Sequence, residues 1–306
     1  MIKQLTAGQG KGKKTHSLGF RKRKIGYILV APAILILLLT TIYPTIYMFF
    51  VSFFRWSIIP TLPRQFIGLR QYLNIFQNPD LYGSIRATLL FVFLVVVVQF
   101  LLGLGLALLI SNSRIRWLRV VFLMPAVIAP VVVGLIWRFM FSHDLGVINY
   151  LISAIGLEKI AWLGQPASAM ASIMIVDIWQ WTPFAMLIFL AGIESLPSES
   201  FEAAKVDGAS VWQSFRFIMF PLLTPVMAIV LMFRSLDAFK TFDIIYMVTR
   251  GGPGASTNLL SHNIWRRAFF ENNMGLAAAL SVIMVILATV MTRFFIRLMS
   301  KTQGTL

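Results

Sequence analysis

Polar side chains that could recognise a sugar lie together inside an apolar segment of the chain. Asp177 is followed closely by Trp179, Gln180, Trp181 and Thr182. An ionisable residue is costly inside a membrane helix, so it usually faces the protein interior. A carboxylate and an amide beside indole rings suit sugar recognition, because polar groups reach hydroxyls and flat rings cover the apolar sugar face. The alternative is that Asp177 forms a structural ion pair near one end of the segment.

A second group of charges lies further along the chain. Arg234, Asp237, Lys240 and Asp243 alternate in sign at every third position, a spacing that permits successive ion pairs on a helix. The spacing favours a self-neutralising ladder, and the alternative is that Asp237 or Lys240 contacts a solute. Gln99, also in an apolar segment, fits a helix–helix hydrogen bond better than a place in a solute pathway. The candidate pathway residues are Asp177, Gln180, Trp181, Asp237, Lys240 and Gln99.

A short charged stretch, "EAAKVDGASVWQSFRFIMFPLLTP" from Glu202 to Pro225, interrupts two long apolar segments. Pro197 and Ser198 precede it and predict a helix start, and Gly208 is placed to end that helix. A second amphipathic piece, Ala209–Phe217, leads to the next apolar segment. We therefore predict two short helices lying along the membrane face, since neither is apolar enough to span.

Other motifs carry no chemistry. The stretch Gly8–Thr15 misses the spacing of a phosphate-binding loop and follows no strand. Gly103 and Gly105 lie in an apolar segment, where small residues allow close helix packing. The chain has no cysteine, and its histidines lack the spacing of a metal site or hydrolytic triad. These are His16, His143 and His262. We expect no catalytic residue, cofactor or metal in this chain.

The composition places these residues in a membrane. The chain has 306 residues, of which 58% are hydrophobic and 12% charged, so it lacks the polar residues needed to cover a soluble surface. Windows of about 20 apolar residues recur along it. The prediction is an all-α polytopic membrane protein with six spans. They cover Ile25–Phe54, Gly83–Ile110, Val120–Phe141, Ala169–Ile193, Ile218–Phe239 and Gly275–Phe295.

The net charge is +16, and many of the basic residues lie next to the spans. Basic residues in such positions set the orientation of membrane helices and bind anionic lipid, so they do not indicate nucleic-acid binding. The first span is too long for a cleaved signal peptide, so we expect it to be retained. An even number of spans puts both termini on one side, and the basic residues beside the spans predict that this side is the cytoplasm. The external basic residues Arg55, Arg64 and Arg70 are a mild exception. The cytoplasmic basic residues are Lys3, Lys11, Lys13, Lys14, Arg21, Lys22, Arg23, Lys24, Arg114, Arg116, Arg119, Arg293, Arg297 and Lys301.

The charged stretch resembles the cytoplasmic loop of the membrane subunits of binding-protein-dependent ABC importers. That pattern is E-A-A-x-x-D-G-A followed by I-x-x-P-L-x-x-P, and Phe220 is a departure where leucine is more usual. Four further segments resemble the carbohydrate-uptake branch of the family, and together they cover most of residues 66–290. They are Phe66–Phe76, Trp117–Phe141, Ile188–Ser210 and Phe242–Thr257.

The resemblance implies a type I importer with alternating access in a bacterial inner membrane. Its loop, at about residues 196–221, is a coupling helix that seats in a cleft of the ATP-hydrolysing subunit. The implied partners are a second permease, two ATPase copies that hold ATP and magnesium, and an extracytoplasmic solute-binding protein. The implied coupling residues are Glu202, Ala203, Ala204, Asp207, Gly208, Ala209 and Pro221.

The chain divides into a basic tail at 1–24, a permease domain at 25–299 and a short tail at 300–306. The external turn at Gly251, Gly252 and Pro253 is either a contact for the solute-binding protein or a rigid corner. Two rival functions are an ion-coupled secondary transporter and a structural scaffold. A secondary transporter predicts repeat symmetry and broken helices, and the sequence shows neither.

Overall fold

The computed structural model describes residues 29–59, 63–111 and 117–303, which form two compact units divided between Phe50 and Val51. Some predicted features lie outside the described residues. They are the basic tail at 1–24, the Gly8–Thr15 stretch, His16, Arg114, Arg116 and the last three residues of the C-terminal tail.

The first unit is an apolar helix. It lies within Leu29–Val51, a 23-residue stretch that includes the π-helical turn η1 (Leu38–Ile42) and α2 (Tyr43–Val51). Nearly all its apolar side chains are exposed, as expected for a helix that faces lipid. The predicted first span ends three residues too late, because the chain turns from helix to a short strand after Val51.

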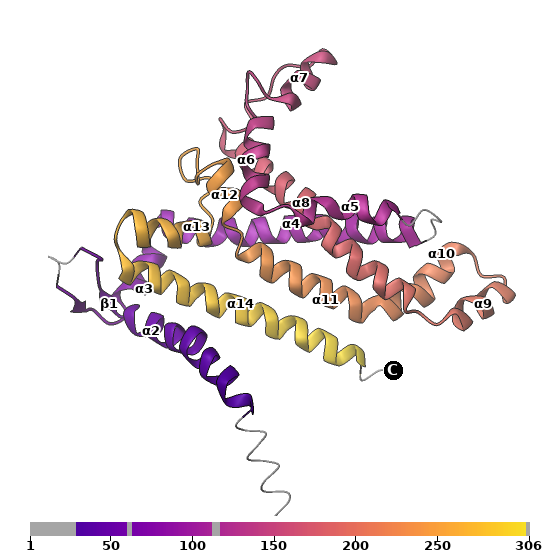
Figure 1. Ribbon diagram of the computed structural model, residues 1–306, viewed down its shortest axis with the longest axis horizontal. Helices are drawn as coiled ribbons and strands as arrows, with labels where there is room; N and C mark the ends of the chain where they lie inside the picture. The colour runs from indigo at the N-terminus through magenta and orange to yellow at the C-terminus, as the bar shows by residue number, and fades with distance from the viewer. Residues whose placement is uncertain (1–28, 60–62, 112–116, 304–306) are drawn as a thin grey trace, which may run out of the picture. The chain divides into compact units, whose positions relative to one another are not determined.

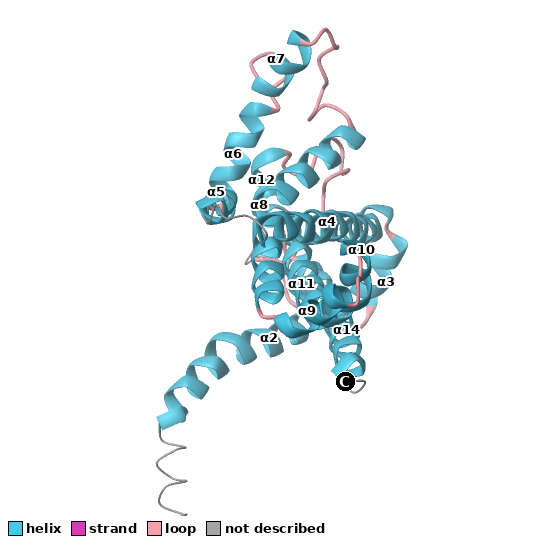
Figure 2. Ribbon diagram, turned by 90° about the vertical axis from the view of Figure 1, so that its right-hand side faces the viewer, coloured by secondary structure: helices cyan, strands magenta, loops and turns pink. Residues whose placement is uncertain are grey.

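Four long helices dominate the second unit (Figures 1 and 2). They are α4 (Pro79–Ser111), α8 (Pro166–Glu194), α11 (Phe220–Phe239) and α14 (Met274–Gln303). Helix α11 contacts α4, α8 and α14, and α4 also packs along α8. The described chain therefore holds five helices long and apolar enough to cross a membrane, or six if one bent pair is a single span.

That bent pair replaces the third predicted span. Helices α5 (Trp117–Val127) and α6 (Pro130–Met140) meet at 95°, so the span predicted over Val120–Phe141 is either one bent span or a re-entrant pair. Ala129 is extended, with ψ of 133°, because a residue before proline avoids the helical region. Pro130 has no N–H to continue the ladder. The sequence prediction that no helix is broken is therefore wrong.

The charged stretch forms α9 (Ser198–Val206), as predicted, and the chain turns at Gly208 with φ of +76°. The second short helix is not separate. Residues Val211–Phe239 form one continuous helix through α10 (Val211–Ser214), the π-helical turn η2 (Phe215–Met219) and α11. Ser210 and Gln213 form a capping box at the start of this helix. The π-helical turn η2 lies just before Pro221, whose nitrogen has no hydrogen to donate to the helix.

Short elements complete the second unit. Strands β1 (Phe54–Arg55) and β2 (Gln65–Phe66) pair antiparallel. Helix α7 (Val147–Ala154) projects away from the long helices in both views (Figures 1 and 2). The short helices are α3 (Arg70–Gln77), α7 (Val147–Ala154), α12 (Asp243–Val248), α13 (Leu260–Trp265) and the π-helical turn η3 (Arg266–Phe270).

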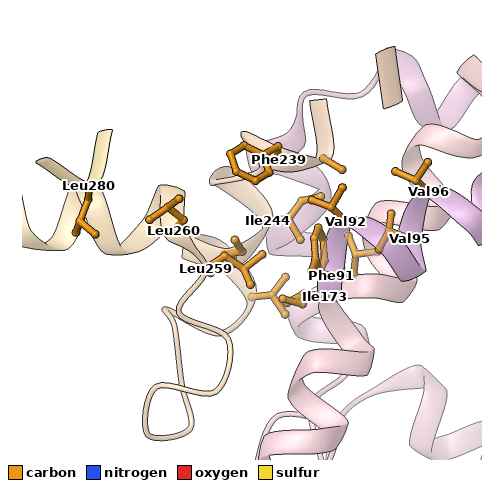
Figure 3. Close-up of a cluster of buried hydrophobic side chains, with 14 of the residues drawn as sticks. Phe91, Val92, Val95, Val96, Ile173, Phe239, Ile244, Leu259, Leu260 and Leu280 are labelled. Carbon is orange, nitrogen blue, oxygen red and sulfur yellow. The ribbon is translucent and has the colours of Figure 1, made fainter. Parts of the chain in front are cut away.

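Two apolar clusters hold the long helices together. The larger joins α4, α8 and α14 to the segment around α12 and α13, and Figure 3 shows several of its side chains. The smaller joins α4, α8 and α11 nearer Ser111. Gly103 is part of this close packing, because a Cβ there would lie 2.8 Å from the Cβ of Ala185. A Cβ at Gly105 would meet nothing within 4 Å, so the packing role predicted for Gly105 is wrong.

Candidate functional site

The buried carboxylate of Asp177 is the acceptor at the centre of a polar cluster between spanning helices. Its Oδ1 accepts from Gln99 Nε2 at 2.9 Å and from the Arg234 guanidinium at 3.2 Å. Its Oδ2 accepts from the Thr241 hydroxyl at 3.2 Å. Gln99 Nε2 also donates to the Asp177 carbonyl at 2.9 Å, which confirms the predicted helix–helix hydrogen bond.

Arg234 joins this cluster to an exposed carboxylate. Its Nε donates to Gln99 Oε1 at 2.9 Å, and a terminal nitrogen pairs with Asp237 Oδ2 at 2.7 Å. The Arg234 side chain is 1% exposed, whereas that of Asp237 is 45% exposed. We call Gln99, Asp177, Arg234, Asp237 and Thr241 the ionic cluster. Side chains from the three spanning helices α4, α8 and α11 thus bond around one buried cation, and Thr241 bonds to Asp177.

The predicted ladder of charges is only partly formed. Arg234 pairs with Asp237 as the spacing predicts, but Lys240 and Asp243 form no ion pair within the described residues. The reason is that α11 ends at Phe239, and Asp243 begins α12. The structural pairing of Asp177 with Arg234 was not visible in the sequence, because the two residues are 57 positions apart.

Two adjoining cavities lie beside the ionic cluster, and both are lined by Trp181, Asp237 and Lys240. One has a volume of about 190 Å³ and also touches Thr241 and Asp243. The other has a volume of about 310 Å³. We call the pair the solute cavity. It places three of the six sequence-predicted pathway residues around an open volume.

The other three pathway candidates do not line this cavity. Asp177, Gln99 and Gln180 are fully buried. Gln180 Nε2 donates to the Ile128 carbonyl at 3.0 Å, where the break between α5 and α6 leaves backbone groups without helical partners. These three side chains therefore hold helices together around the cavity. Trp181 lines the cavity and also adjoins the buried ionic cluster, because its ring centroid lies 5.3 Å from Arg234 Cζ.

The α9 segment presents charges away from the bundle. Ala204 is buried, while Glu202, Asp207 and Gly208 are exposed, and neither carboxylate has an ion-pair partner in the described chain. A groove of about 840 Å³ follows α9 and the helix after it, which the sequence did not predict. Its lining residues are Leu108, Phe201, Lys205, Ala209, Val211, Trp212, Ser214, Phe215 and Met219.

The predicted tight turn is present and internally bonded. Gly251 and Gly254 have φ of +84° and +62°, and the Thr257 hydroxyl donates to the Gly252 carbonyl at 2.8 Å. Gly251 is buried against the ring of His262, since a Cβ at Gly251 would lie 2.7 Å from His262 Cε1. This geometry fits a rigid corner, and a contact with a solute-binding protein stays a prediction for Gly252 and Pro253.

His262 supports that corner as a neutral side chain. Its Nδ1–H donates to Asn258 Oδ1 at 2.8 Å, and its ring lies among Phe242, Tyr246 and Trp265. Burial, and then the charge of Arg266, lowers the pKa of His262 to about 4. Across the described residues, no group of three or more metal-ligating side chains is found.

Comparison with known proteins gives the family of this chain. Residues 99–302 match the family described as binding-protein-dependent transport system inner membrane component. The chain belongs to this family of ABC importer permeases.

Two relatives match over nearly their whole length. The chain is 34% identical to the trehalose/maltose transport system permease protein MalF of Thermococcus litoralis, covering 92% of this chain and 96% of the relative. It is 35% identical to the sulfoquinovosyl glycerol transport system permease protein SmoG of Agrobacterium fabrum, covering 93% of each.

A solved structure shares the fold. One chain of the crystal structure of a bacterial alginate ABC transporter, in complex with an alginate pentasaccharide-bound periplasmic protein, matches with a TM-score of 0.81. The identity is 23%, and the match covers 92% of this chain and 96% of that one. The all-α polytopic fold predicted from the sequence is confirmed.

Proposed function

We propose that this chain is one of two permease subunits of an ATP-driven importer of a carbohydrate, such as a sugar, oligosaccharide, polyol or glycoside. An extracytoplasmic solute-binding protein delivers the solute, and two ATPase subunits hydrolyse ATP with magnesium. This chain itself has no catalytic role. The named cargoes of the relatives, trehalose/maltose and sulfoquinovosyl glycerol, support the carbohydrate class.

The observation that carries the proposal is the exposed α9 and its direct connection to a spanning helix. Glu202 and Asp207 can pair with donors in a cleft of the ATPase subunit, and the alanines make the helix slim enough to enter it. The chain turns at Gly208, and the next helix runs without interruption from Val211 to Phe239. A movement of the seated α9 therefore passes to α11 as a rigid body, which is a known mode of gating.

The proposed location is the bacterial cytoplasmic membrane with both termini in the cytoplasm. If α5 and α6 form one bent span, the number of spans is six and α9 lies on the same side as the termini. Helix α5 starts beside the end of α8, where Arg119 pairs with Glu194, and Phe141 at the end of α6 packs against Trp162, just before the start of α8. These contacts support a bent span that crosses from one end of the bundle to the other.

The experiment measures the coupling of ATP hydrolysis to transport. The variants Glu202→Lys and Gly208→Lys, reconstituted with the ATPase subunits and the binding protein, should keep ATP hydrolysis but lose at least about tenfold in sugar uptake per ATP, since a few kcal/mol of docking energy is removed. The control Glu158→Lys reverses an exposed charge between spans three and four and should change nothing. An unchanged ratio of uptake to ATP hydrolysis in both α9 variants would contradict the coupling role.

The rival function is an ion-coupled carrier. The broken third span is a feature that such carriers also have, but the family match and the exposed α9 favour the ATP-driven importer. Sugar uptake by the reconstituted permease pair without any ATPase subunit would establish the rival.

A further inference from the structure

We infer that the groove between α9 and the helix after it binds an anionic phospholipid of the cytoplasmic leaflet, with an acyl chain against its apolar lining and the phosphate at Lys205. We call this volume the α9 groove. The inference goes beyond the proposed function and uses only the proposed sidedness of α9, which assigns the leaflet. It follows from the lining of the groove, the place where the groove opens and the charges beside it.

The lining of the α9 groove is largely apolar. The groove has a volume of about 840 Å³, and its wall includes Leu108 near the end of α4, Phe201 on α9, and Trp212 and Phe215 on the helix that begins at Val211. Water beside such side chains is displaced favourably by an apolar group. The lining therefore suits a hydrocarbon chain better than a soluble polar ligand.

The groove opens at the end of the spanning helices, where the bilayer can reach it. Figure 1 shows α9 and α10 at one end of the long helices. Leu101 lies seven residues, or about two turns, before Leu108 on the same face of α4, and it is 61% exposed. Trp212, a residue type that gathers at the level of the lipid headgroups, is 68% exposed. The groove wall thus continues along α4 onto an exposed apolar surface, so an acyl chain can enter from the side.

Lys205 is the one charged side chain among the described residues that line the groove, and it forms no ion pair within the described chain. Phe201 and Lys205 are four residues apart and share one face of α9, whereas Glu202 lies about 100° around the helix from Phe201. The buried Ala204 marks a third side of the helix. The acidic residue that we assign to the ATPase subunit therefore points away from the groove.

A second cation lies beside the groove. Arg216 is four residues after the lining residue Trp212, and its Cζ lies 5.7 Å from the ring centroid of Phe220. It is exposed and has no ion pair in the described part of the chain. Two cations beside an apolar wall match a ligand with a phosphate on a hydrocarbon chain, because basic residues at the cytoplasmic surface attract anionic lipid.

A lipid in this groove would join two segments that otherwise have little contact. Ala204 is the buried residue of α9, and a Cβ at Gly208, where the chain turns, would meet nothing within 4 Å. An acyl chain between Phe201 and Phe215 contacts α9 and the following helix at once. The bound lipid therefore stiffens the connection between α9 and α11.

The test localises the lipid by photo-crosslinking in the assembled complex with its ATPase subunits. Phosphatidylcholine vesicles carry a small fraction of either phosphatidylglycerol or phosphatidylcholine with a diazirine on the acyl chain, and mass spectrometry then identifies the labelled peptides. We expect label within residues 211–219, with about fivefold more from phosphatidylglycerol. That ratio corresponds to the contribution of about 1 kcal/mol from one basic residue near the membrane surface.

Two variants separate the headgroup from the acyl chain. Lys205→Gln removes the charge at the groove wall, so the two lipids should label residues 211–219 equally. Ser214→Phe places a ring in the groove, so the label from both lipids should be lost. The control Lys159→Gln removes an exposed charge far from α9 in the sequence and should keep the wild-type ratio. If Ser214→Phe does not fold, Lys205→Gln still decides the site, since its side chain is exposed.

Three results would overturn the lipid site. They are absence of label in residues 211–219 of the wild type, an unchanged lipid ratio in Lys205→Gln, and label in the isolated permease that disappears in the assembled complex. The last result would mean that the ATPase subunit fills the groove. ATP-dependent sugar uptake, measured on the same vesicles, reports separately on the importer function. Loss of uptake with the label retained would contradict that function and leave the lipid site in place.

Discussion

Arg234 shows how a cation can be buried in a membrane protein without being left unpaired. Removing a charge from water is costly, and that cost is offset only when partners satisfy its hydrogen bonds. Gln99, Asp177 and Asp237 satisfy the guanidinium from three directions. At this scale Asp237 is the most exposed member of the cluster, and the buried members hold its carboxylate through Arg234.

His262 gives a pH-dependent prediction at the residue scale. Its pKa is lowered from 6.5 to about 4 in the folded chain, so the unfolded chain binds a proton first as the pH falls. The stability that neutral His262 contributes is present above pH 6.5 and is lost as the pH falls toward 4. Thermal midpoints of the purified complex should therefore fall less steeply across this range in His262→Gln than in the wild type.

The control for this experiment is His143→Gln, which replaces an exposed histidine. It should follow the wild-type pH dependence. Parallel curves for the wild type and His262→Gln would show that His262 does not contribute to the pH dependence of stability.

Helices α4 and α8 illustrate the element scale, because their closest approach depends on a single missing side chain. A Cβ at Gly103 would lie 2.8 Å from Ala185 Cβ and 3.1 Å from the Met186 backbone nitrogen. The two helices must separate to admit it. That separation would also stretch the hydrogen bonds between Gln99 and Asp177, one turn away on the same pair of helices.

Gly103→Ala should therefore destabilise the protein by about 1–3 kcal/mol, the usual cost of overpacking. Gly105→Ala is a matched control on the same helix, where the added methyl meets nothing within 4 Å. A lower thermal midpoint for the first variant and an unchanged or higher one for the second is the expected result. Equal midpoints would show that the α4–α8 contact adjusts without cost.

The path of the chain through the membrane is decided at the scale of the whole molecule, and it depends on whether the bent pair α5–α6 crosses the membrane. If the pair spans, residues between α6 and α8 lie on the opposite side from α9. If the pair instead re-enters, the segment between α6 and α8 stays in the cytoplasm. Helix α8 then crosses to the outside, and α9 lies on the external side. The contacts of α5 with α8 and of α6 with α12 favour the spanning arrangement.

Cysteine labelling tests this topology, because the chain has no cysteine of its own. Leu157→Cys should react with a membrane-impermeant maleimide in intact cells, and Asp207→Cys should react only after permeabilisation. Both side chains are exposed in this chain, so in cells that express the permease without its ATPase subunits the access to reagent depends on sidedness. The reverse pattern would mean that α5–α6 is re-entrant, which would place α9 away from any cytoplasmic ATPase.

The sequence by itself determined the elements, because their signals are local. Runs of apolar residues predict the long helices, proline and serine predict the start of α9, and Gly208 predicts its end. Where those local signals were incomplete, the predictions were wrong. Pro130 lies within the third predicted span, but the chain bends there between α5 and α6.

The tertiary structure alone decided which polar residues share a site. Asp177 and Arg234 are far apart along the chain, and so are Gln99 and Asp177, so no local spacing predicts their bonds. Packing of α4, α8 and α11 brings them together, because a buried charge is stable only where other helices supply its partners. The same packing separates Asp177, which is buried, from Asp237, which lines the cavity.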